Sequence, residues 1–256
     1  MKKRNSFKSL IRENPLKIIV RMFGYDLINK KSKPHYELMP HLLTLINHLK
    51  INCFIDVGAN NGNFGLDLRE VGYEGLIVSF EPVSSTYKEL LDVSDDDPLW
   101  RTYNLALGSA NEKMEINLLK DSDLNSLLPP NDYFQKIFKE QSIIATEMID
   151  VRTFDSMIDE ITKGIAEPRI FLKMDTQGYD HEVLKGASGC INKIQGISSE
   201  LSFSPLYQGM MGYVDALEFY SSYGFKVTGI YPVSRDLDNL SLIEADCFMV
   251  RTKKKS

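Results

Sequence analysis

The segment FIDVGANNGNFG, residues 54–65, contains an acidic residue, Asp56, followed closely by two glycines and two asparagines. Gly58 and Gly62 have no side chain, so the backbone can turn tightly there and approach a ligand closely. Asn60 tolerates a left-handed backbone and can donate an amide hydrogen bond. A carboxylate at this turn disfavours a pyrophosphate and favours a cation. The pattern therefore predicts a strand-to-helix turn that binds a ligand carrying positive charge.

A second acidic residue, Glu81, ends the apolar run GLIVSFE and follows Gly62 by 19 residues. In nucleotide-binding folds, an acid about 20 residues after the glycine turn binds the ribose hydroxyls. Ligands of open parallel sheets lie at the carboxyl ends of the strands, so Asp56 and Glu81 are expected to face one crevice. Together they predict a nucleoside site. A tight turn with no ligand is the structural alternative.

Two further acids, Asp175 and Glu200, lie at or near the ends of later apolar runs. One could accept the proton of a hydroxyl while the other orients it. Alternatively, both could bind a divalent cation such as Mg²⁺, with Asp246 as a third candidate ligand. Holding a ligand's ammonium group or capping a helix is the structural alternative for either acid. His181 is another candidate base, although a lone histidine in a first helical turn often faces solvent.

A parallel sheet is needed to bring these residues together, and the pattern from residue 51 onward predicts one. Short apolar runs alternate with helical patterns, which is typical of an α/β fold with a mostly parallel sheet and helices on both faces. The expected strands are 52–58, 75–82, one within 99–109, an extra strand 112–119 beside it, 169–178, 196–203, 225–232 and 245–251. The expected helices are 64–72, 85–93, the second part of 151–161, 179–194 and 213–224. The last two strands are expected to form an antiparallel pair at the sheet edge.

Composition divides the chain into a basic helical extension at 1–50, a main domain at 51–251 and a basic tail at 252–256. Residues 120–148 are the least regular part of the main domain, and such a segment between core strands is often a lid or a substrate-binding insertion. Residues 1–33 contain ten Lys and Arg and two acidic residues, so their formal net charge is +8 and that of the rest of the chain is −13. The extension is either a solvated terminus or a peripheral contact with an acidic membrane surface.

The overall composition indicates which binding partners and which cellular compartment to expect. The chain has 256 residues, a formal net charge of −5 and a pI of about 5.5, which argues against non-specific binding to nucleic acid. No nucleic-acid partner is therefore expected. Three cysteines far apart, without a CxxC pair, fit a reducing compartment. Without a signal peptide or a spanning apolar run of ~20 residues, the expected location is the cytoplasm, with the inner face of the membrane as the alternative. The sequence does not fix the oligomeric state.

Several segments together resemble the FkbM type of class I S-adenosylmethionine-dependent methyltransferases. In chain order, they are FIDVGANNGNFG, VSFEP, NLALGS, VRTFDSMI, FLKMDTQGYDHEVLKGA, ELSFSPLYQG and DCFMVR, which cover most of residues 51–251. The resemblance implies a Rossmann-like seven-stranded sheet with a reversed final strand, the class I methyltransferase fold. It also implies S-adenosylmethionine as cofactor and O-methylation of a hydroxyl, often on a sugar or a polyketide.

The resemblance also implies which residues bind the cofactor. The methionine end would lie along the glycine turn, the ribose at Glu81, and the adenine near Asn104 and Ala106. The full set is Asp56, Gly58, Ala59, Asn60, Gly62, Glu81, Pro82, Asn104 and Ala106. One position departs from the family: Gln177, in DTQG, stands where an acid is usual. That departure puts in doubt any role of this position in binding metal or substrate as an acid would.

Aromatic, amide and hydroxyl side chains near the mouth of the crevice are candidate acceptor contacts, because sugars bind through stacking and dense hydrogen bonding. The substrate candidates are Asn125, Ser126, Gln177, Tyr207 and Gln208.

The resulting hypothesis is an O-methyltransferase acting on a sugar of a glycan or glycoconjugate, or on another small molecule such as a polyketide. Two alternatives stay open. A nicotinamide-dependent oxidoreductase is disfavoured by the missing third glycine, and a non-catalytic binding module is disfavoured by Asp175 and Glu200.

Overall fold

The computed structural model describes residues 33–252, and the chain divides into two units, Met1–Pro40 and His41–Ser256. The first unit contributes only the beginning of helix α2 (Lys33–Leu49) to the described part. Predictions made for the basic residues before Lys33 lie outside the described residues. No helix within the described range is long and apolar enough to cross a lipid bilayer.

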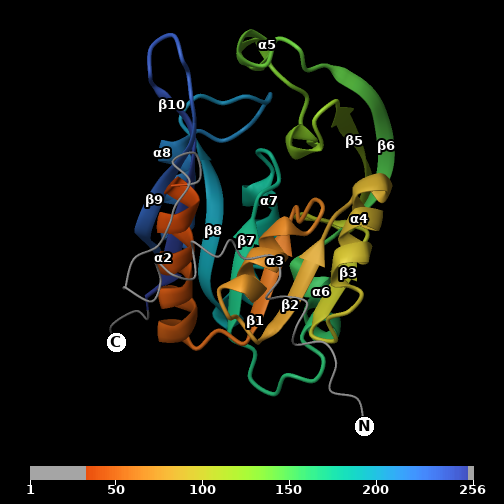
Figure 1. Cartoon of the computed structure of the whole chain (residues 1–256), viewed down its shortest axis with the longest axis vertical. Coiled ribbons are helices and arrows are strands. Elements are labelled where there is room, and N and C mark those ends of the chain that lie inside the picture. The colour runs from red at the N-terminus through yellow and green to blue at the C-terminus, as the bar shows by residue number, and fades with distance from the viewer. Residues whose placement is uncertain (1–32, 253–256) are drawn as a thin grey trace, which may run out of the picture. The chain divides into compact units, whose positions relative to one another are not determined.

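Seven strands of the described chain form one sheet in the order β3-β2-β1-β7-β8-β10-β9 (Figure 1). They are β1 (Cys53–Val57), β2 (Leu76–Phe80), β3 (Trp100–Tyr103), β7 (Ile170–Met174), β8 (Ile194–Ser202), β9 (Phe225–Arg235) and β10 (Leu242–Arg251). Parallel pairing joins β3, β2, β1, β7 and β8 in this order, whereas β10 is antiparallel to both β8 and β9. This confirms the predicted mostly parallel sheet with an antiparallel pair at its edge. Because β10 is reversed, its first residues lie beside the carboxyl ends of the parallel strands.

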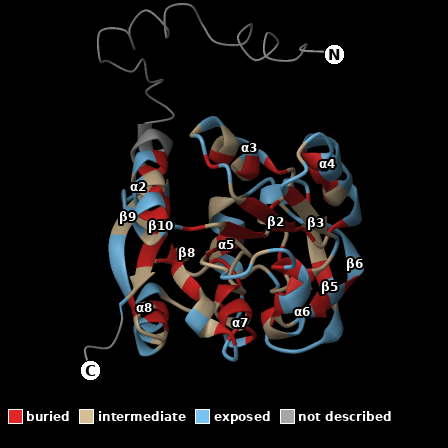
Figure 2. Ribbon diagram, turned by 90° about the horizontal axis from the view of Figure 1, so that it is seen from below, coloured by how far each residue is buried: buried red, intermediate tan, exposed pale blue. Residues whose placement is uncertain are grey.

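Helices cover both faces of the sheet, α3 and α4 on one side and α6, α7 and α8 on the other (Figure 2). Their bounds are α3 (Asn63–Glu70), α4 (Ser84–Ser94), α6 (Phe154–Ile161), α7 (Asp180–Lys185) and α8 (Tyr213–Ser222). Phe54 of β1 stacks on Phe171 of β7 with ring centroids 5.2 Å apart and also contacts Phe64 of α3. On the other face, Ile55 belongs to the core that contains Phe154 of α6. Burial on both faces explains why the central strands are continuous apolar runs in the sequence.

Helix α7 is shorter than the predicted helix 179–194 and ends at Lys185. Beyond it, the backbone N–H groups of Gly189 and Cys190 donate to the Asp155 carboxylate at 2.8 and 2.9 Å. These donors therefore have a partner on α6, and the N–H of Cys190 is shared with the carbonyl of Ala187 at 3.2 Å. A carboxylate distant in sequence thus ends the helix earlier than the local pattern predicts.

A second sheet of three strands within the described chain, in the order β4-β6-β5, follows β3 (Figure 1). It contains β4 (Ala106–Leu107), β5 (Glu112–Leu119) and β6 (Ile143–Arg152), with the short helices η2 (Ser122–Leu124) and α5 (Asp132–Ile137) between β5 and β6. The predicted strand 112–119 exists, but its predicted place beside the third strand is wrong, because β5 pairs antiparallel with β6. Most side chains of β6 are exposed, so this strand lacks the apolar run that marks the core strands.

The insertion 120–148 shares a small core with the loop that follows β8 and with β10. Phe134 of α5 is fully buried, and its ring centroid lies 5.5 Å from that of Tyr207. The side chain of Asn131 accepts a hydrogen bond from the N–H of Phe134 at 2.9 Å and donates to the carbonyl of Pro205 at 2.8 Å. The insertion is therefore fixed against the loop that follows β8, at the carboxyl edge of the large sheet.

Candidate functional site

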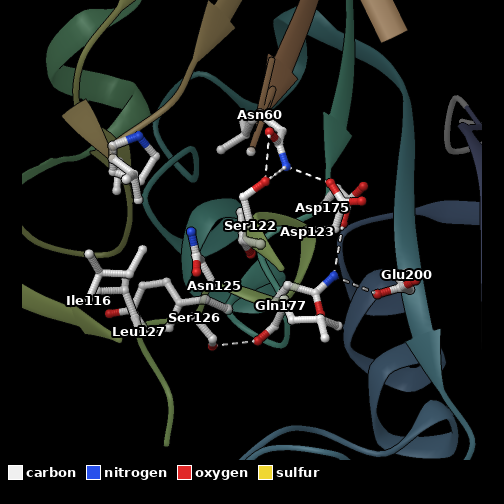
Figure 3. Close-up of a pocket in the computed structure, with 18 of the residues that line it drawn as sticks. Asn60, Ile116, Ser122, Asp123, Asn125, Ser126, Leu127, Asp175, Gln177 and Glu200 are labelled. Atoms are coloured by element: carbon white, nitrogen blue, oxygen red, sulfur yellow. Dashed lines mark hydrogen bonds between the residues drawn. The ribbon is translucent and has the colours of Figure 1, made fainter. Parts of the chain in front are cut away.

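A cavity of about 340 Å³ lies at the carboxyl edge of the seven-stranded sheet (Figure 3). This volume is near the lower end of the range typical of small-molecule sites. Residues at the ends of β1 and β2 and from the second sheet line one part, with apolar side chains such as Phe80, Val83 and Leu107. Among the described lining residues none is Lys, Arg or His, whereas five are carboxylates. These are Glu81, Asp123, Asp175, Glu200 and Glu244.

The turn after β1 adopts left-handed backbone at three positions. Gly58 and Gly62 have φ of 76° and 86°, and Asn60 between them has φ of 47°. A Cβ on Gly58 would stand 1.9 Å from the backbone oxygen of Asp175, so a side chain there would force the ends of β1 and β7 apart. The N–H of Gly58 donates to the carbonyl of Phe80 at 3.0 Å, which connects the turn to the end of β2.

Glu81 follows β2 directly, lines the cavity and is only 6% exposed. Its Oε2 accepts from the N–H of Asn60 at 3.0 Å, and its Oε1 accepts from the N–H of Val83 at 2.9 Å. These bonds orient the carboxylate and leave lone pairs on both oxygens for the hydroxyls of a ligand. Burial, opposed by the two N–H donors and reinforced by the carboxylates of Asp56 and Glu147, raises the pKa of Glu81 to about 7.

The raised pKa of Glu81 predicts a pH-dependent stability. Its pKa of about 7 in the folded chain lies above the ordinary value of 4.5, so the folded state binds this proton more tightly than the unfolded state. This tighter binding of the proton stabilises the folded state fully below the ordinary pKa of 4.5. The stabilisation, on the order of 3 kcal/mol, is lost as the pH rises through the folded-state pKa of about 7. Urea unfolding across this range should show the free energy of unfolding of the wild type falling relative to that of Glu81→Gln. Parallel pH curves for the two proteins would contradict this expectation.

Asn60 connects the glycine turn to the insertion. Its Nδ2 donates to Oδ1 of Asp123 at 2.6 Å and to Oγ of Ser122 at 3.3 Å (Figure 3). Both partners belong to η2, and both line the cavity. The side chain of Asn60 therefore has a use besides its left-handed backbone, because it holds η2 against the glycine turn.

The amide of Gln177 joins the two candidate catalytic carboxylates. Its Nε2 lies 3.3 Å from Oδ1 of Asp175 and 3.3 Å from Oε2 of Glu200, so it can donate one hydrogen to each (Figure 3). Its Oε1 accepts from the hydroxyl of Tyr207 at 3.1 Å, and its backbone carbonyl accepts from Oγ of Ser126 at 2.8 Å. An amide at this position donates to both carboxylates without adding a third negative charge.

Glu244, which the sequence does not single out, also lines the cavity from the start of β10. Its Oε2 accepts from Oγ of Ser234 at 3.1 Å, while its Oε1 is buried without a hydrogen-bond partner among the described residues. Burial, with the carboxylate of Asp175 nearby, raises the pKa of Glu244 to about 7 against the opposing hydrogen bonds with Ser234 and Glu200. Burial and then the carboxylate of Glu244 raise the pKa of Glu200 well above its ordinary value. The reversal of the last strand was the sequence signal that could have found Glu244, because it brings the start of that strand to the carboxyl edge.

Asp56 does not line the cavity, and its side chain is fully buried. Its Oδ1 accepts from Nζ of Lys173 at 2.9 Å, and Nζ also lies 3.5 Å from Oδ2 of Asp175. Burial works to lower the pKa of Lys173, but the attraction of Asp56 and Asp175 outweighs it and raises the pKa overall. The structure therefore places Asp56 in a buried ion pair, in contrast to the expected position facing the crevice. Its contact with a cofactor stays a prediction.

The other predicted residues divide by whether they line the cavity. Those lining it are Pro82, Ala106, Asn125 and Ser126. Those outside its lining are Ala59, Gly62, Asn104, His181, Tyr207, Gln208 and Asp246. His181 lies with its Nε2 3.2 Å from the Glu182 carboxylate on α7, outside the cavity. Within residues 33–252 no group of three or more His, Cys, Asp or Glu could hold a metal ion, so the predicted Mg²⁺ site finds no support.

Known proteins resemble this chain in sequence pattern and in fold. The Methyltransferase FkbM domain model matches residues 56–227 of the chain. A comparison with curated proteins gives no match. Among solved structures, the chain is similar to an rRNA methylase from Streptococcus thermophilus, with 9% identity over 79% of this chain and 81% of that chain and a TM-score of 0.41. It is also similar to Aeropyrum pernix fibrillarin with natively bound S-adenosyl-L-methionine, with 9% identity over 78% of this chain and 66% of that chain and a TM-score of 0.40.

One expectation about partners needs correction. The sequence predicts no nucleic-acid partner because the net charge is −5. That prediction is wrong as an exclusion, because solved structures similar to this chain include the rRNA methylase and a Methanococcus jannaschii fibrillarin titled as a pre-rRNA processing protein. The fibrillarin shares 10% identity over 80% of this chain and 68% of that chain, with a TM-score of 0.42. Net charge describes the whole surface and does not decide what one cavity accepts.

Proposed function

The chain belongs to the FkbM methyltransferase family, whose domain model matches residues 56–227, and from this premise we propose that it is an O-methyltransferase. The proposed methyl donor is S-adenosylmethionine, and the proposed acceptor is a hydroxyl of a sugar in a glycan or glycoconjugate. The methyltransferase domain is residues 51–251. One observation carries the proposal: a single amide joins two carboxylates, Asp175 and Glu200, in the cavity that also contains Glu81.

The residues of the cavity fit S-adenosylmethionine. Glu81 offers two oriented acceptor oxygens for the ribose hydroxyls, and Phe80, Val83 and Leu107 offer an apolar surface for the adenine. Gly58 has no side chain, so the methionine part could pass close to the backbone. Five lining carboxylates, with no cation among the described lining residues, favour a ligand with a sulfonium and an ammonium over one with a pyrophosphate. This charge pattern supports the methyl donor against a nicotinamide dinucleotide.

The chain's own residues would activate the acceptor. S-adenosylmethionine, when bound, supplies an electrophilic methyl group on a sulfonium. A hydroxyl is a weak nucleophile until a base accepts its proton. Glu200 is the proposed base, because burial and neighbouring carboxylates raise its pKa and make its carboxylate more basic. Asp175, with Nζ of Lys173 3.5 Å from its Oδ2, is the proposed acceptor-orienting group.

A hydroxyl of a polyketide or another small molecule is a second candidate acceptor. Apolar side chains also line the cavity, and they would suit an acceptor less polar than a sugar. They include Ile116, Leu124, Leu127, Phe138 and Val233.

Calorimetric titration of the full chain with S-adenosylhomocysteine, and separately with NADH, tests the cofactor. We expect S-adenosylhomocysteine to bind and NADH to give no heat of binding. Binding of NADH alone would support the oxidoreductase alternative and contradict the proposal.

The acceptor is tested by incubating the chain and S-adenosylmethionine with an oligosaccharide mixture and, separately, with a structured RNA. Mass spectrometry of the products is expected to show one added methyl group on an oligosaccharide. Methylation of the RNA alone would contradict a sugar acceptor while leaving the methyltransferase activity intact.

A further inference from the structure

One buried carboxylate oxygen of the cavity, Oε1 of Glu244, has no donor among the described residues. Glu244 lines the cavity and is 5% exposed, and its Oε1 is buried without a hydrogen-bond partner among the described residues. An unpaired buried acceptor is costly, and more so when it carries charge. A donor supplied by the ligand would remove this cost, so Glu244 is a candidate for contact with the acceptor.

Each of the other lining carboxylates accepts at least one hydrogen bond within the chain, as Glu244 does from Ser234 through its Oε2. Backbone or side-chain N–H groups, or the ammonium of Lys173, donate to Glu81, Asp123, Asp175 and Glu200. No described lining residue is a cation, so the negative charge on β8 and β10 is not neutralised from within the cavity. The missing partner of Glu244 is therefore best supplied by a group that combines N–H donors with positive charge.

Glu200 and Glu244 lie close enough to act on one ligand. The antiparallel register of β8 and β10 pairs Glu244 with Ser202, which is two residues from Glu200. Because side chains alternate between the faces of a strand, residues two apart on β8 point to the same face. Glu244 and Glu200 thus share a face on neighbouring strands, and the negative charge of Glu244 raises the pKa of Glu200.

We propose that the acceptor is an amino sugar, whose protonated amine binds Glu244 while an adjacent hydroxyl lies at Glu200. The proposal rests on the proposed O-methyltransferase function and specifies its substrate class. A protonated amine has three N–H donors and a positive charge, so it satisfies Oε1 of Glu244 and reduces the repulsion between the two carboxylates. A hydroxyl or an acetylated amine at the same place offers one donor and no charge.

A matched pair of ligands tests this proposal: methyl glucosaminide, which carries the amine, and its N-acetyl counterpart, which does not. Their affinities for the full chain are measured by NMR titration at physiological salt, with and without S-adenosylhomocysteine. We expect the amine to bind about tenfold more tightly, as one charge-assisted hydrogen bond allows. This preference is expected to vanish in Glu244→Gln and to persist in Glu74→Gln, which makes the same change at an exposed residue outside the cavity.

Three results would overturn the amino-sugar assignment: equal affinities for the two glycosides, no binding of either, or an amine preference that survives in Glu244→Gln. If Glu244→Gln does not fold, the comparison of the two glycosides on the wild type decides alone. Failure of S-adenosylhomocysteine to bind would instead refute the proposed function. Binding of S-adenosylhomocysteine is measured separately from the preference for an amine.

Discussion

Glu200→Gln is expected to lower kcat for methyl transfer by about 10²–10⁴-fold, the range that a general base typically contributes. The substitution keeps the size of the side chain, and its amide oxygen can still accept from Nε2 of Gln177. It removes the ability to take the proton of the acceptor hydroxyl. Affinity for S-adenosylhomocysteine should stay close to that of the wild type, because β1 and β7 separate β8, which contains Glu200, from β2, which precedes Glu81, the proposed ribose contact.

The effect of Glu200→Gln is measured as initial rates of methyl transfer under saturating S-adenosylmethionine, with calorimetry for the cofactor product. Glu74→Gln serves as the control, since Glu74 is exposed and lies outside the cavity. If kcat falls less than about tenfold in Glu200→Gln, another group accepts the proton, and Asp175 is then the first to examine.

Asp56→Ala is expected to lower the free energy of unfolding by roughly 3–5 kcal/mol, because it leaves the charge of Lys173 buried without its closer partner. The two side chains are joined at 2.9 Å, with Asp56 fully buried and the side chain of Lys173 11% exposed. Asp175 stays 3.5 Å from Nζ, so the loss should fall toward the lower part of that range. Urea unfolding at neutral pH measures the change.

A double-mutant cycle separates this ion pair from a direct role in binding cofactor. Lys173→Met removes the cation, and Asp56→Ala combined with Lys173→Met should recover much of the stability that either single change loses. If Asp56 instead contacts the cofactor, as the sequence predicts, the opposite pattern of stability and binding is expected. In that case Asp56→Ala would unfold at nearly the same urea concentration as the wild type and bind S-adenosylhomocysteine far more weakly.

The large sheet was predictable because its strands are buried on both faces. A doubly buried strand leaves a continuous apolar run, and an acid directly after such a run stands at the carboxyl edge. This rule located Glu81 and Asp175, and Glu200 lies two residues before the end of β8; all three line the cavity. The glycine turn was equally visible, since left-handed backbone favours Gly and Asn and both Gly58 and Asn60 have positive φ.

The second sheet was predicted less well because its signals are weak or ambiguous. Strand β6 is mostly exposed, and β5 alone cannot reveal which strand it pairs with. Pairing depends on how the chain returns after the insertion, and no local pattern encodes that path. The contact of Asn60 with η2, across 63 positions of sequence to Asp123, is hidden from the sequence for the same reason.

The sequence by itself determined the succession along the chain of the strands of the large sheet and the helices that cover it, the turn after the first strand and three of the acids at the cavity, because each leaves a mark within a few residues. Only the tertiary structure decided which charges meet. Lys173 reaches Asp56 across 117 positions, and Glu244 enters the cavity because the last strand runs backwards beside β8. Whether a carboxylate faces a ligand or a buried cation depends on its neighbours in space, and burial makes those neighbours decisive by removing the water that would otherwise stabilise the charge.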